Sequence, residues 1–247
     1  MLDGRACPSR TGSPKEHPVG RPRTQGSTRR FRVRLTGTPK SAFGELCSAR
    51  RFSRPNVEGG SGMSRIAVPT RDQAPAESRP ILDAVTRQLG FTPNLHRLMS
   101  ISPAVLAGFI GLQGPLSKTL DFRTRDAIAL VVSEVNGCYY CLAAHSYVAA
   151  NFGKASPEEI ALNRHGQSSD AKTGAAARFA AKVIEARGHV TDADFAAVRD
   201  VGFSDRQIIE IVALSVQFLL TDFMNNVAGT EIDFPLIEPP PAADLSS

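Results

Sequence analysis

The sequence predicts an all-α fold, a bundle of short and medium helices. Three observations carry this prediction. Apolar residues recur at the i, i+3, i+4 and i+7 spacing of a buried helix face. Glycines, prolines and capping sequences divide the chain into segments of helix length. No stretch of six residues alternates convincingly between apolar and polar, as a half-buried strand would.

Three short helices are expected first. A helix over residues 80–89 ends at Gly90, because glycine readily adopts the left-handed conformation found at helix C-termini. Helices over 93–99 and 103–112 each open with a proline, which is tolerated in the first turn because the N–H groups there have no intrahelical partner.

Two helices are expected in the middle of the chain. Residues 123–135 form one apolar face at helical spacing, made by Ile128, Val131, Val132 and Val135. Asn136 and Gly137 interrupt this pattern, and helical spacing resumes over 138–152. The interruption places a Cys-x-x-Cys sequence at the beginning of the second of these helices.

Capping sequences mark the remaining helices. Ser156-Pro157-Glu158-Glu159 combines a capping box with a proline in the first turn. The next helix covers 171–187. Two further boxes follow over 191–194 and 204–207, and the second opens the most apolar helix of the chain, 206–227.

The net charge of +5 is unevenly distributed. Residues 1–62 hold 13 basic residues against four acidic ones, a net charge of +9, and the remainder holds 16 basic against 20 acidic ones, a net charge of −4. The basic pI therefore does not predict a nucleic-acid partner for the folded part. No apolar run approaches the roughly 18 residues of a membrane span. We expect neither nucleic-acid nor membrane binding, and a cytoplasmic location.

The chain divides into three parts by composition. Residues 1–62 are rich in Arg, Pro, Gly and Ser and are expected to form a disordered basic leader. Residues 63–234 form the predicted helical domain, and 235–247 a loose proline-rich tail. We expect translation to begin at Met63, since Glu58-Gly59-Gly60 is what a purine-rich ribosome-binding site encodes in frame; the intact mass of the native protein tests this.

Chemistry concentrates around two of the four cysteines, Cys138 and Cys141. On a helix they share one face with His145. The positive end of the helix dipole favours a thiolate, which would make Cys138 the nucleophile, and an imidazole one turn on can move a proton. Asp126 and Glu134 are the two candidates for a carboxylate that orients His145 or relays its proton.

These groups suit peroxide reduction. One thiolate attacks the O–O bond and becomes a sulfenic acid, the neighbouring thiol condenses with it to a disulfide, and an external dithiol restores the pair. Zinc is the alternative ligand of such a pair, but a structural zinc site takes four ligands and only three residues converge here. We expect neither a metal nor another cofactor.

The pattern of these residues resembles a known family. Arg125-Asp126 before an apolar helix, followed by Asn136-Gly137-Cys138-x-x-Cys141-x-x-x-His145, is similar to the alkylhydroperoxidase D (AhpD-like) group of the carboxymuconolactone decarboxylase superfamily. The segment 222–228 is similar to the peroxidase-related branch of that group. The resemblance covers residues 66–234.

The resemblance implies an all-α AhpD-like bundle that assembles as a homo-oligomer and needs no haem, flavin or metal. It implies that Cys141 is the peroxidatic residue, with Cys138 as its disulfide partner and His145 in a proton relay. The relay glutamate of the family stands twelve residues before the first cysteine. That position is Asp126 here, one methylene shorter, so Glu134 stays a second candidate.

The predicted function is therefore that of an antioxidant enzyme, a thiol-dependent peroxidase that reduces alkyl hydroperoxides or hydrogen peroxide. An external dithiol or a thioredoxin-like protein would supply the electrons. Two alternatives stay open: an enzyme like the carboxymuconolactone decarboxylases, and a non-catalytic thiol redox sensor or scaffold.

Overall fold

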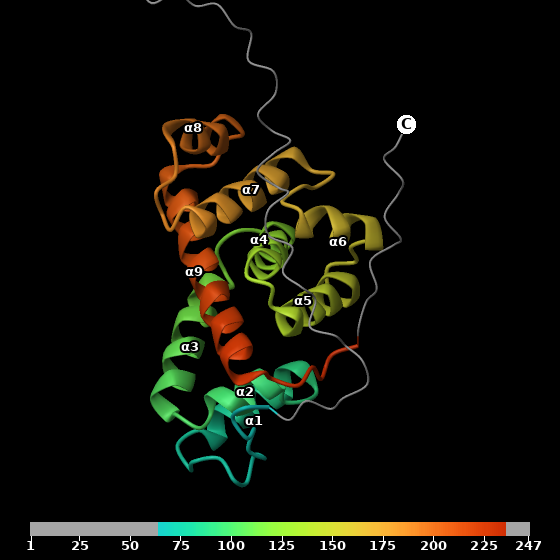
Figure 1. The fold of residues 1–247 in the computed structure, drawn as a ribbon, viewed down its shortest axis with the longest axis vertical. Helices are drawn as coiled ribbons and strands as arrows, with labels where there is room; N and C mark the ends of the chain where they lie inside the picture. Colours follow the sequence, from blue (N-terminus) through green and yellow to red (C-terminus); the bar gives the residue numbers. More distant parts are fainter. Residues whose placement is uncertain (1–63, 236–247) are drawn as a thin grey trace, which may run out of the picture. The chain divides into compact units, whose positions relative to one another are not determined.

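The structure is a computed structural model, and it describes residues 64–235. Over that range it contains helices and no strand, as predicted (Figure 1). The helices are α1 Arg79–Leu89, α2 Asn94–Met99, α3 Pro103–Leu116, α4 Phe122–Val135, α5 Tyr139–Asn151, α6 Pro157–Arg164, α7 Ala171–Glu185, α8 Asp192–Asp200 and α9 Asp205–Ala228. The predicted leader over 1–62, the start at Met63 and the tail from residue 236 onward lie outside the described residues.

Helix α4 lies in the middle of the bundle and packs against α5, α6, α7 and α9 (Figure 1). Its apolar side chains join those of α7 and α9 in the largest of three hydrophobic cores of the described residues. The second core is built from α1, α2 and α3, and it includes Cys138 and Cys141. The cysteine pair therefore lies where the three N-terminal helices meet the rest of the bundle.

Helix α9 is the longest helix of the described residues, and its side chains contribute to both of these cores. The prediction that it is also the most apolar helix is wrong, because α3 is more apolar. By length and composition alone α9 is the one helix among residues 64–235 that could cross a membrane. Its polar residues Ser215, Asp222 and Asn225 are buried, and α9 packs against α3, α4, α5 and α7. Buried polar residues that face neighbouring helices are typical of a core helix rather than of one that faces lipid.

Most predicted helix ends are confirmed. Gly90 follows α1 with φ of 83°, and both capping boxes, at Thr191 with Asp194 and at Ser204 with Gln207, are formed. The box predicted at Ser156 forms only in part. Ser156 caps the N–H of Glu159, but the Glu159 carboxylate accepts hydrogen bonds from Ser168 Oγ and Ser169 N instead of returning to the cap.

Helix α3 is longer than predicted. We expected it to end at Leu112. It continues to Leu116, so that Pro115 stands in the last turn. The extra turn is important for the site, because Gln113 and Gly114 line the cavity described below.

Candidate active site

The cysteine pair is held by the turn between α4 and α5. Gly137 has φ of 61°, in the left-handed region that glycine adopts without strain, and the chain reverses there. Cys138 follows as the N-cap of α5, and its Sγ accepts the backbone N–H of Cys141 at 3.3 Å. We expected both residues inside the helix; Cys138 instead lies one residue before it. Both are free thiols, 0% and 2% exposed.

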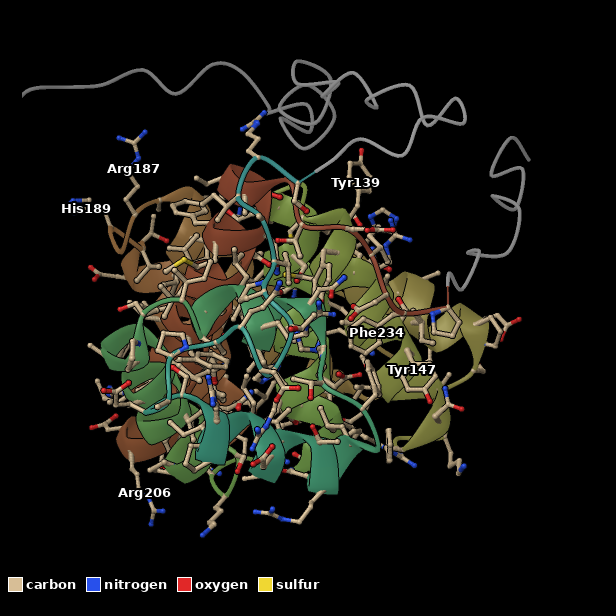
Figure 2. All side chains as sticks on the ribbon, turned by 90° about the horizontal axis from the view of Figure 1, so that it is seen from below. Tyr139, Tyr147, Arg187, His189, Arg206 and Phe234 are labelled. Atoms are coloured by element: carbon tan, nitrogen blue, oxygen red, sulfur yellow. The ribbon has the colours of Figure 1, made fainter. Side chains whose placement is uncertain are left out.

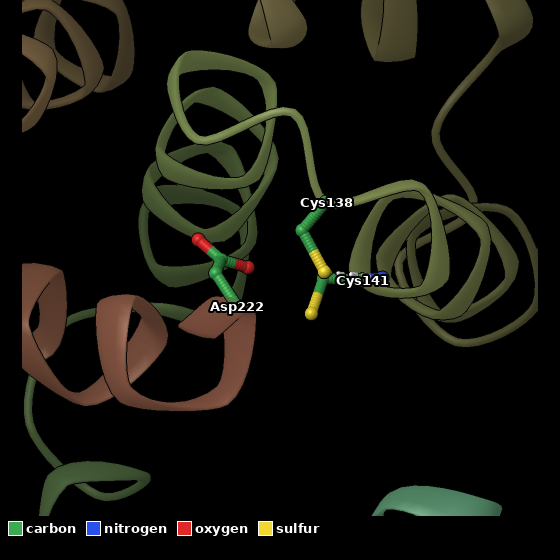
Figure 3. Close-up of side chains that lie close together, drawn as sticks. All are labelled: Cys138, Cys141 and Asp222. Atoms are coloured by element: carbon green, nitrogen blue, oxygen red, sulfur yellow. Dashed lines mark hydrogen bonds between the residues drawn. The ribbon is translucent and has the colours of Figure 1, made fainter. Parts of the chain in front are cut away.

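Asp222 of α9 faces the pair (Figure 3). One of its carboxylate oxygens and the two sulfur atoms all lie within 4.8 Å of one another. Asp222 is fully buried, and it accepts hydrogen bonds from Ser133 Oγ at 3.2 Å and Asn136 Nδ2 at 2.9 Å. Both donors belong to the end of α4. The hydrogen bonds therefore fix the carboxylate relative to the turn that holds the cysteines.

Asn225, one turn after Asp222, binds the second cysteine. Its Nδ2 donates to Cys141 Sγ at 3.3 Å, and its Oδ1 is buried without a hydrogen-bond partner. A donor aimed at sulfur stabilises the thiolate form of Cys141 relative to the thiol. Asp222 and Asn225 thus contact the cysteine pair from a helix more than 80 residues later in the chain.

Burial is the main influence on the pKa values of Cys141 and Asp222, and it raises both. It raises the pKa of the Cys141 thiol, and the neighbouring Cys138 and Asp222 raise this pKa further. Burial also raises the pKa of Asp222, against the opposing effect of hydrogen bonds from Cys141 and Asn136. The helix dipole, which we expected to favour a thiolate, is outweighed at Cys141. A protonated Cys141 needs a base, and the Asp222 carboxylate is positioned to be one.

His145 is directed toward Asp126. Its Nδ1 lies 3.6 Å from Asp126 Oδ1, and its ring packs edge-on against Phe218 with centroids 5.1 Å apart. Burial raises the pKa of the Asp126 carboxyl, and the adjacent His145 opposes this rise. Glu134 instead forms an ion pair with Arg164 of α6 at 2.7 Å. Of the two carboxylates considered from the sequence, Asp126 is therefore the one beside His145.

A cavity of about 520 Å³ gives access to the site. Cys141, His145 and Asp126 line it, and Cys138 does not. Phe234, which packs against Tyr147 and Tyr140, forms part of its wall, whereas Tyr139 points outward to solvent (Figure 2). Asp126 also lines a second pocket of about 390 Å³. Lys154, Glu158 and Ser169 are among the other residues that line this second pocket. Asp126 thus links the cavity at Cys141 to a polar pocket.

The cluster of Cys138, Cys141 and Asp222 is also the candidate metal site of the described residues. Thiolates and a carboxylate are zinc ligands, but a structural zinc site takes four of them. Within residues 64–235 no fourth cysteine, histidine or carboxylate joins the cluster. The donor set fits a redox pair with an adjacent base better than a closed zinc site.

Comparison with known proteins relates the middle of this chain to a family. The model of the carboxymuconolactone decarboxylase family matches residues 103–186, which run from the beginning of α3 to the end of α7. The AhpD core of a peroxidase-related protein from Ralstonia eutropha JMP134 is similar with a TM-score of 0.63 and 26% identity, covering 70% of this chain and 94% of that one. The match of the central segment and the likeness to the AhpD core both support the AhpD-like branch of the carboxymuconolactone decarboxylase superfamily that the sequence pattern predicts.

Other solved structures share the AhpD-like fold. A peroxidase-related protein from Silicibacter sp. TM1040 is similar with a TM-score of 0.62 and 24% identity, covering 71% of this chain and 94% of that one. The debrominase Bmp8, solved with 2,3,4-tribromopyrrole, is similar with a TM-score of 0.57 and 22% identity, covering 71% and 93%. No curated protein matches the chain at a significant level.

The residues that match the family model include only part of the candidate active site. It includes Cys138, Cys141, His145 and Asp126, all of which the sequence singled out. Asp222 and Asn225 of α9 lie beyond it, and sequence reasoning gave them no role. A signal was present: both are polar residues at positions that helical spacing assigns to the buried face of α9, and polar groups on such a face need a partner.

Proposed function

We propose that this AhpD-like protein is a thiol-dependent peroxidase in which Cys141 attacks the peroxide. The observation that carries the proposal is the arrangement of two free thiols and a buried carboxylate within 4.8 Å of one another, in which Cys141 lines the cavity and Cys138 does not. Family and structural neighbours support an enzyme of this kind, and they also fit the decarboxylase alternative.

The first step is the oxidation of Cys141. The Cys141 thiol gives its proton to Asp222, and the sulfur attacks the terminal oxygen of the hydroperoxide. The O–O bond breaks, Cys141 becomes a sulfenic acid, and the alkoxide leaves. A proton from His145, replenished through Asp126 from the polar pocket, converts the alkoxide to an alcohol. Asn225 donates to the attacking sulfur as its negative charge develops.

The second step closes the disulfide. Cys138 accepts the N–H of Cys141 at the beginning of α5, which holds its sulfur beside the second cysteine. The Cys138 thiol releases its proton to solvent as its sulfur attacks the sulfenic sulfur, an S–S bond forms, and water leaves with a proton from the protonated Asp222. An external dithiol or a thioredoxin-like protein then reduces the disulfide, and its own two thiols become a disulfide.

The decarboxylase and the redox sensor differ from the peroxidase in how they would use Cys138 and Cys141. A decarboxylase of this superfamily does not depend on a redox cysteine pair, so it gives no reason for both thiols to lie beside a buried base. A redox sensor would use the same pair but oxidise once instead of cycling. Turnover with a reductant distinguishes the peroxidase from both.

We expect the reduced protein to consume cumene hydroperoxide and hydrogen peroxide for many turnovers when dithiothreitol is supplied. Peroxide loss should match dithiol oxidation mole for mole, and omission of dithiothreitol should leave a protein two hydrogens lighter, with Cys138 bonded to Cys141. The measurements are peroxide titration and intact mass. Stoichiometric oxidation without turnover would instead indicate a sensor.

A second reductive activity is favoured by the size of the cavity. The debrominase Bmp8 binds a brominated pyrrole, and its likeness to this chain is one of fold. The same thiol pair can supply two electrons and two protons to a carbon–halogen bond, yielding the dehalogenated ring, halide and the disulfide. Bromide release from 2,3,4-tribromopyrrole in the same assay tests this candidate.

We also propose that the homo-oligomer expected from the sequence forms through α9. Ile209, Val216, Phe223 and Val227 are exposed and lie on one stripe of this helix, with spacings of seven, seven and four residues. A stripe of this kind is complementary to a second copy of itself related by a twofold axis. The occupant we propose is therefore another copy of the chain.

The oligomer proposal predicts that Val216→Glu lowers the assembly state measured by analytical ultracentrifugation, because the charge would be buried at the contact. Ile101→Glu, at a similarly exposed apolar residue outside α9, is the matched control and should leave assembly unchanged. Equal sedimentation of both variants and the wild type would exclude this surface.

A further inference from the structure

The cluster of Cys138, Cys141 and Asp222 brings three metal-binding atoms together at the start of α5 (Figure 3). The two sulfur atoms and one carboxylate oxygen all lie within 4.8 Å of one another. Zinc binds thiolate sulfur at about 2.3 Å and carboxylate oxygen at about 2.1 Å, which places the ligand atoms of a tetrahedral site roughly 3.5 to 3.8 Å apart. The separations in the cluster exceed this spacing by at most about 1 Å, which side-chain rotation can close.

The carboxylate of this cluster is already oriented by hydrogen bonds. Ser133 Oγ donates to Asp222 Oδ1 at 3.2 Å, and Asn136 Nδ2 donates to Asp222 Oδ2 at 2.9 Å. A carboxylate oxygen has two lone pairs, so each of these oxygens keeps one for a metal ion. Hydrogen bonds that orient a ligand in this way are a regular part of metal sites, because they fix the direction in which the ligand points.

An unpaired acceptor lies beside the second cysteine. Asn225 is 3% exposed, its Nδ2 donates to Cys141 Sγ at 3.3 Å, and Oδ1 of the same amide is buried without a hydrogen-bond partner. The sequence predicted no metal because a closed site takes four protein ligands, but an open zinc site takes three and holds a water molecule in the fourth position. A water molecule on the metal would supply the hydrogen bond that Asn225 Oδ1 lacks, and a buried acceptor is costly to leave unpaired.

Cys141 gives an ion a route to the cluster, because it lines the cavity of about 520 Å³. Thiols bind zinc as thiolates, so binding releases one proton from each cysteine. A buried thiolate without a compensating charge is costly, and both cysteines of the pair are buried. The two positive charges of zinc offset both thiolates, so the ion stabilises a doubly deprotonated pair that the protein alone disfavours.

We propose that the reduced cysteine pair and Asp222 form an exchangeable zinc site with an open fourth position. Zinc and peroxide then compete for the Cys141 sulfur, because the ion occupies the lone pair that attacks the O–O bond. Oxidation of the zinc-free pair to the disulfide, by the steps given above, removes both thiolate ligands, so peroxide drives the release of zinc. The competition rests on the function proposed above, whereas the zinc site itself needs only the reduced pair.

Metal titration of the full chain tests the zinc site. Cys7→Ser and Cys47→Ser, combined in one parent protein, leave Cys138 and Cys141 as its only cysteines. The reduced, desalted parent protein is titrated with Zn²⁺ in competition with a chromophoric chelator, and separately with Co²⁺. We expect one ion per chain and the release of two protons per ion. The cobalt protein should show the strong visible absorption of a tetrahedral site and a sulfur-to-cobalt charge-transfer band.

Two aspartates offer a matched pair of variants. Asp222→Asn removes the charged oxygen ligand and should raise the Kd for Zn²⁺ by at least the roughly 10- to 100-fold that the loss of an orienting partner costs. Asp126→Asn neutralises another buried carboxyl that lines the cavity but lies outside the cluster, and it should leave the Kd unchanged. Cys138→Ser tests the same site without a change at Asp222, and it should also raise the Kd and weaken the charge-transfer band.

Three results would overturn the zinc site. The first is that the parent protein binds no zinc, and the second is that Asp222→Asn binds it as tightly as the parent protein does. The third concerns diamide, which oxidises a dithiol without any peroxide. Diamide should release one equivalent of zinc, and retention of the ion by the disulfide form would contradict the proposed ligands.

Failure of the zinc site and failure of the peroxidase proposal give different results. Hydrogen peroxide is added once to the zinc-loaded and the zinc-free protein, and the remaining thiols are titrated. We expect slower oxidation of the zinc-loaded protein, and equal rates with zinc bound would exclude the competition. Zinc binding without thiol loss in either form would leave the site and exclude the peroxidase. Thiol loss without zinc binding would exclude the site and leave the peroxidase.

Discussion

Replacement of Cys141 by serine is expected to abolish peroxide turnover, whereas Cys138→Ser should still react with one equivalent of peroxide. The difference follows from access, because Cys141 lines the cavity and Cys138 does not. In Cys138→Ser the sulfenic acid on Cys141 has no neighbouring thiol and should accumulate. A dimedone-type probe, followed by mass spectrometry of peptides, locates the modified sulfur in each variant.

The same pair of variants tests the opposite assignment. If Cys138 is the attacking residue, as its hydrogen bond from Cys141 N and the helix dipole would favour on their own, the probe labels Cys138 in Cys141→Ser and nothing in Cys138→Ser. Serine is nearly isosteric with cysteine, and both variants should melt close to the wild type. Thermal unfolding therefore serves as the control for folding in both cases.

The sequence alone predicted the local part of this site. Helix boundaries, the Cys-x-x-Cys pair and His145 all depend on residues within about one helical turn of each other, where spacing and capping preferences act directly. The choice between Asp126 and Glu134 was beyond such reasoning. The two residues are eight positions apart on α4, about 80° around a helix with 3.6 residues per turn. Only the packing of α4 decides which of them faces His145.

The contacts of Asp222 and Asn225 could be identified only from the three-dimensional structure. Residues 208, 211, 215, 218, 222 and 225 are among the buried positions of α9, and they follow one another at alternating spacings of three and four. This repeat predicts that Asp222 and Asn225 are buried, and a buried aspartate requires partners. It does not predict which helix supplies them. Ser133 and Asn136 lie 86 to 89 residues earlier in the chain, at the end of α4.

Asp222→Asn is expected to slow the oxidation of Cys141 by roughly a hundredfold to ten-thousandfold, the usual contribution of a positioned acid or base. Asparagine keeps the shape of the side chain and can still accept one hydrogen bond, but it cannot accept the thiol proton. The wild-type rate should rise with pH as Asp222 ionises around its raised pKa, and Asp222→Asn should lack this rise. Single-turnover oxidation, followed by thiol titration across pH, measures both.

Ser133→Ala is the matched control for this prediction. It removes one hydrogen bond to the Asp222 carboxylate and leaves the base in place. Because that hydrogen bond favours the ionised form, its loss should raise the pKa of Asp222 further and move the rise in rate to higher pH without abolishing it. A purely structural role for Asp222 predicts instead that both variants slow the reaction equally at every pH.

The Asp222→Asn variant should lose activity without losing thermal stability. Burial raises the pKa of Asp222 in the folded state, so between the unfolded and folded pKa values the folded protein binds more protons than the unfolded chain. The free energy of unfolding then falls as pH rises through that window. Asp222→Asn removes this contribution and should be at least as stable as the wild type at pH values where Asp222 is ionised. Loss of both activity and thermal stability in this variant would show that Asp222 supports the fold and not the reaction.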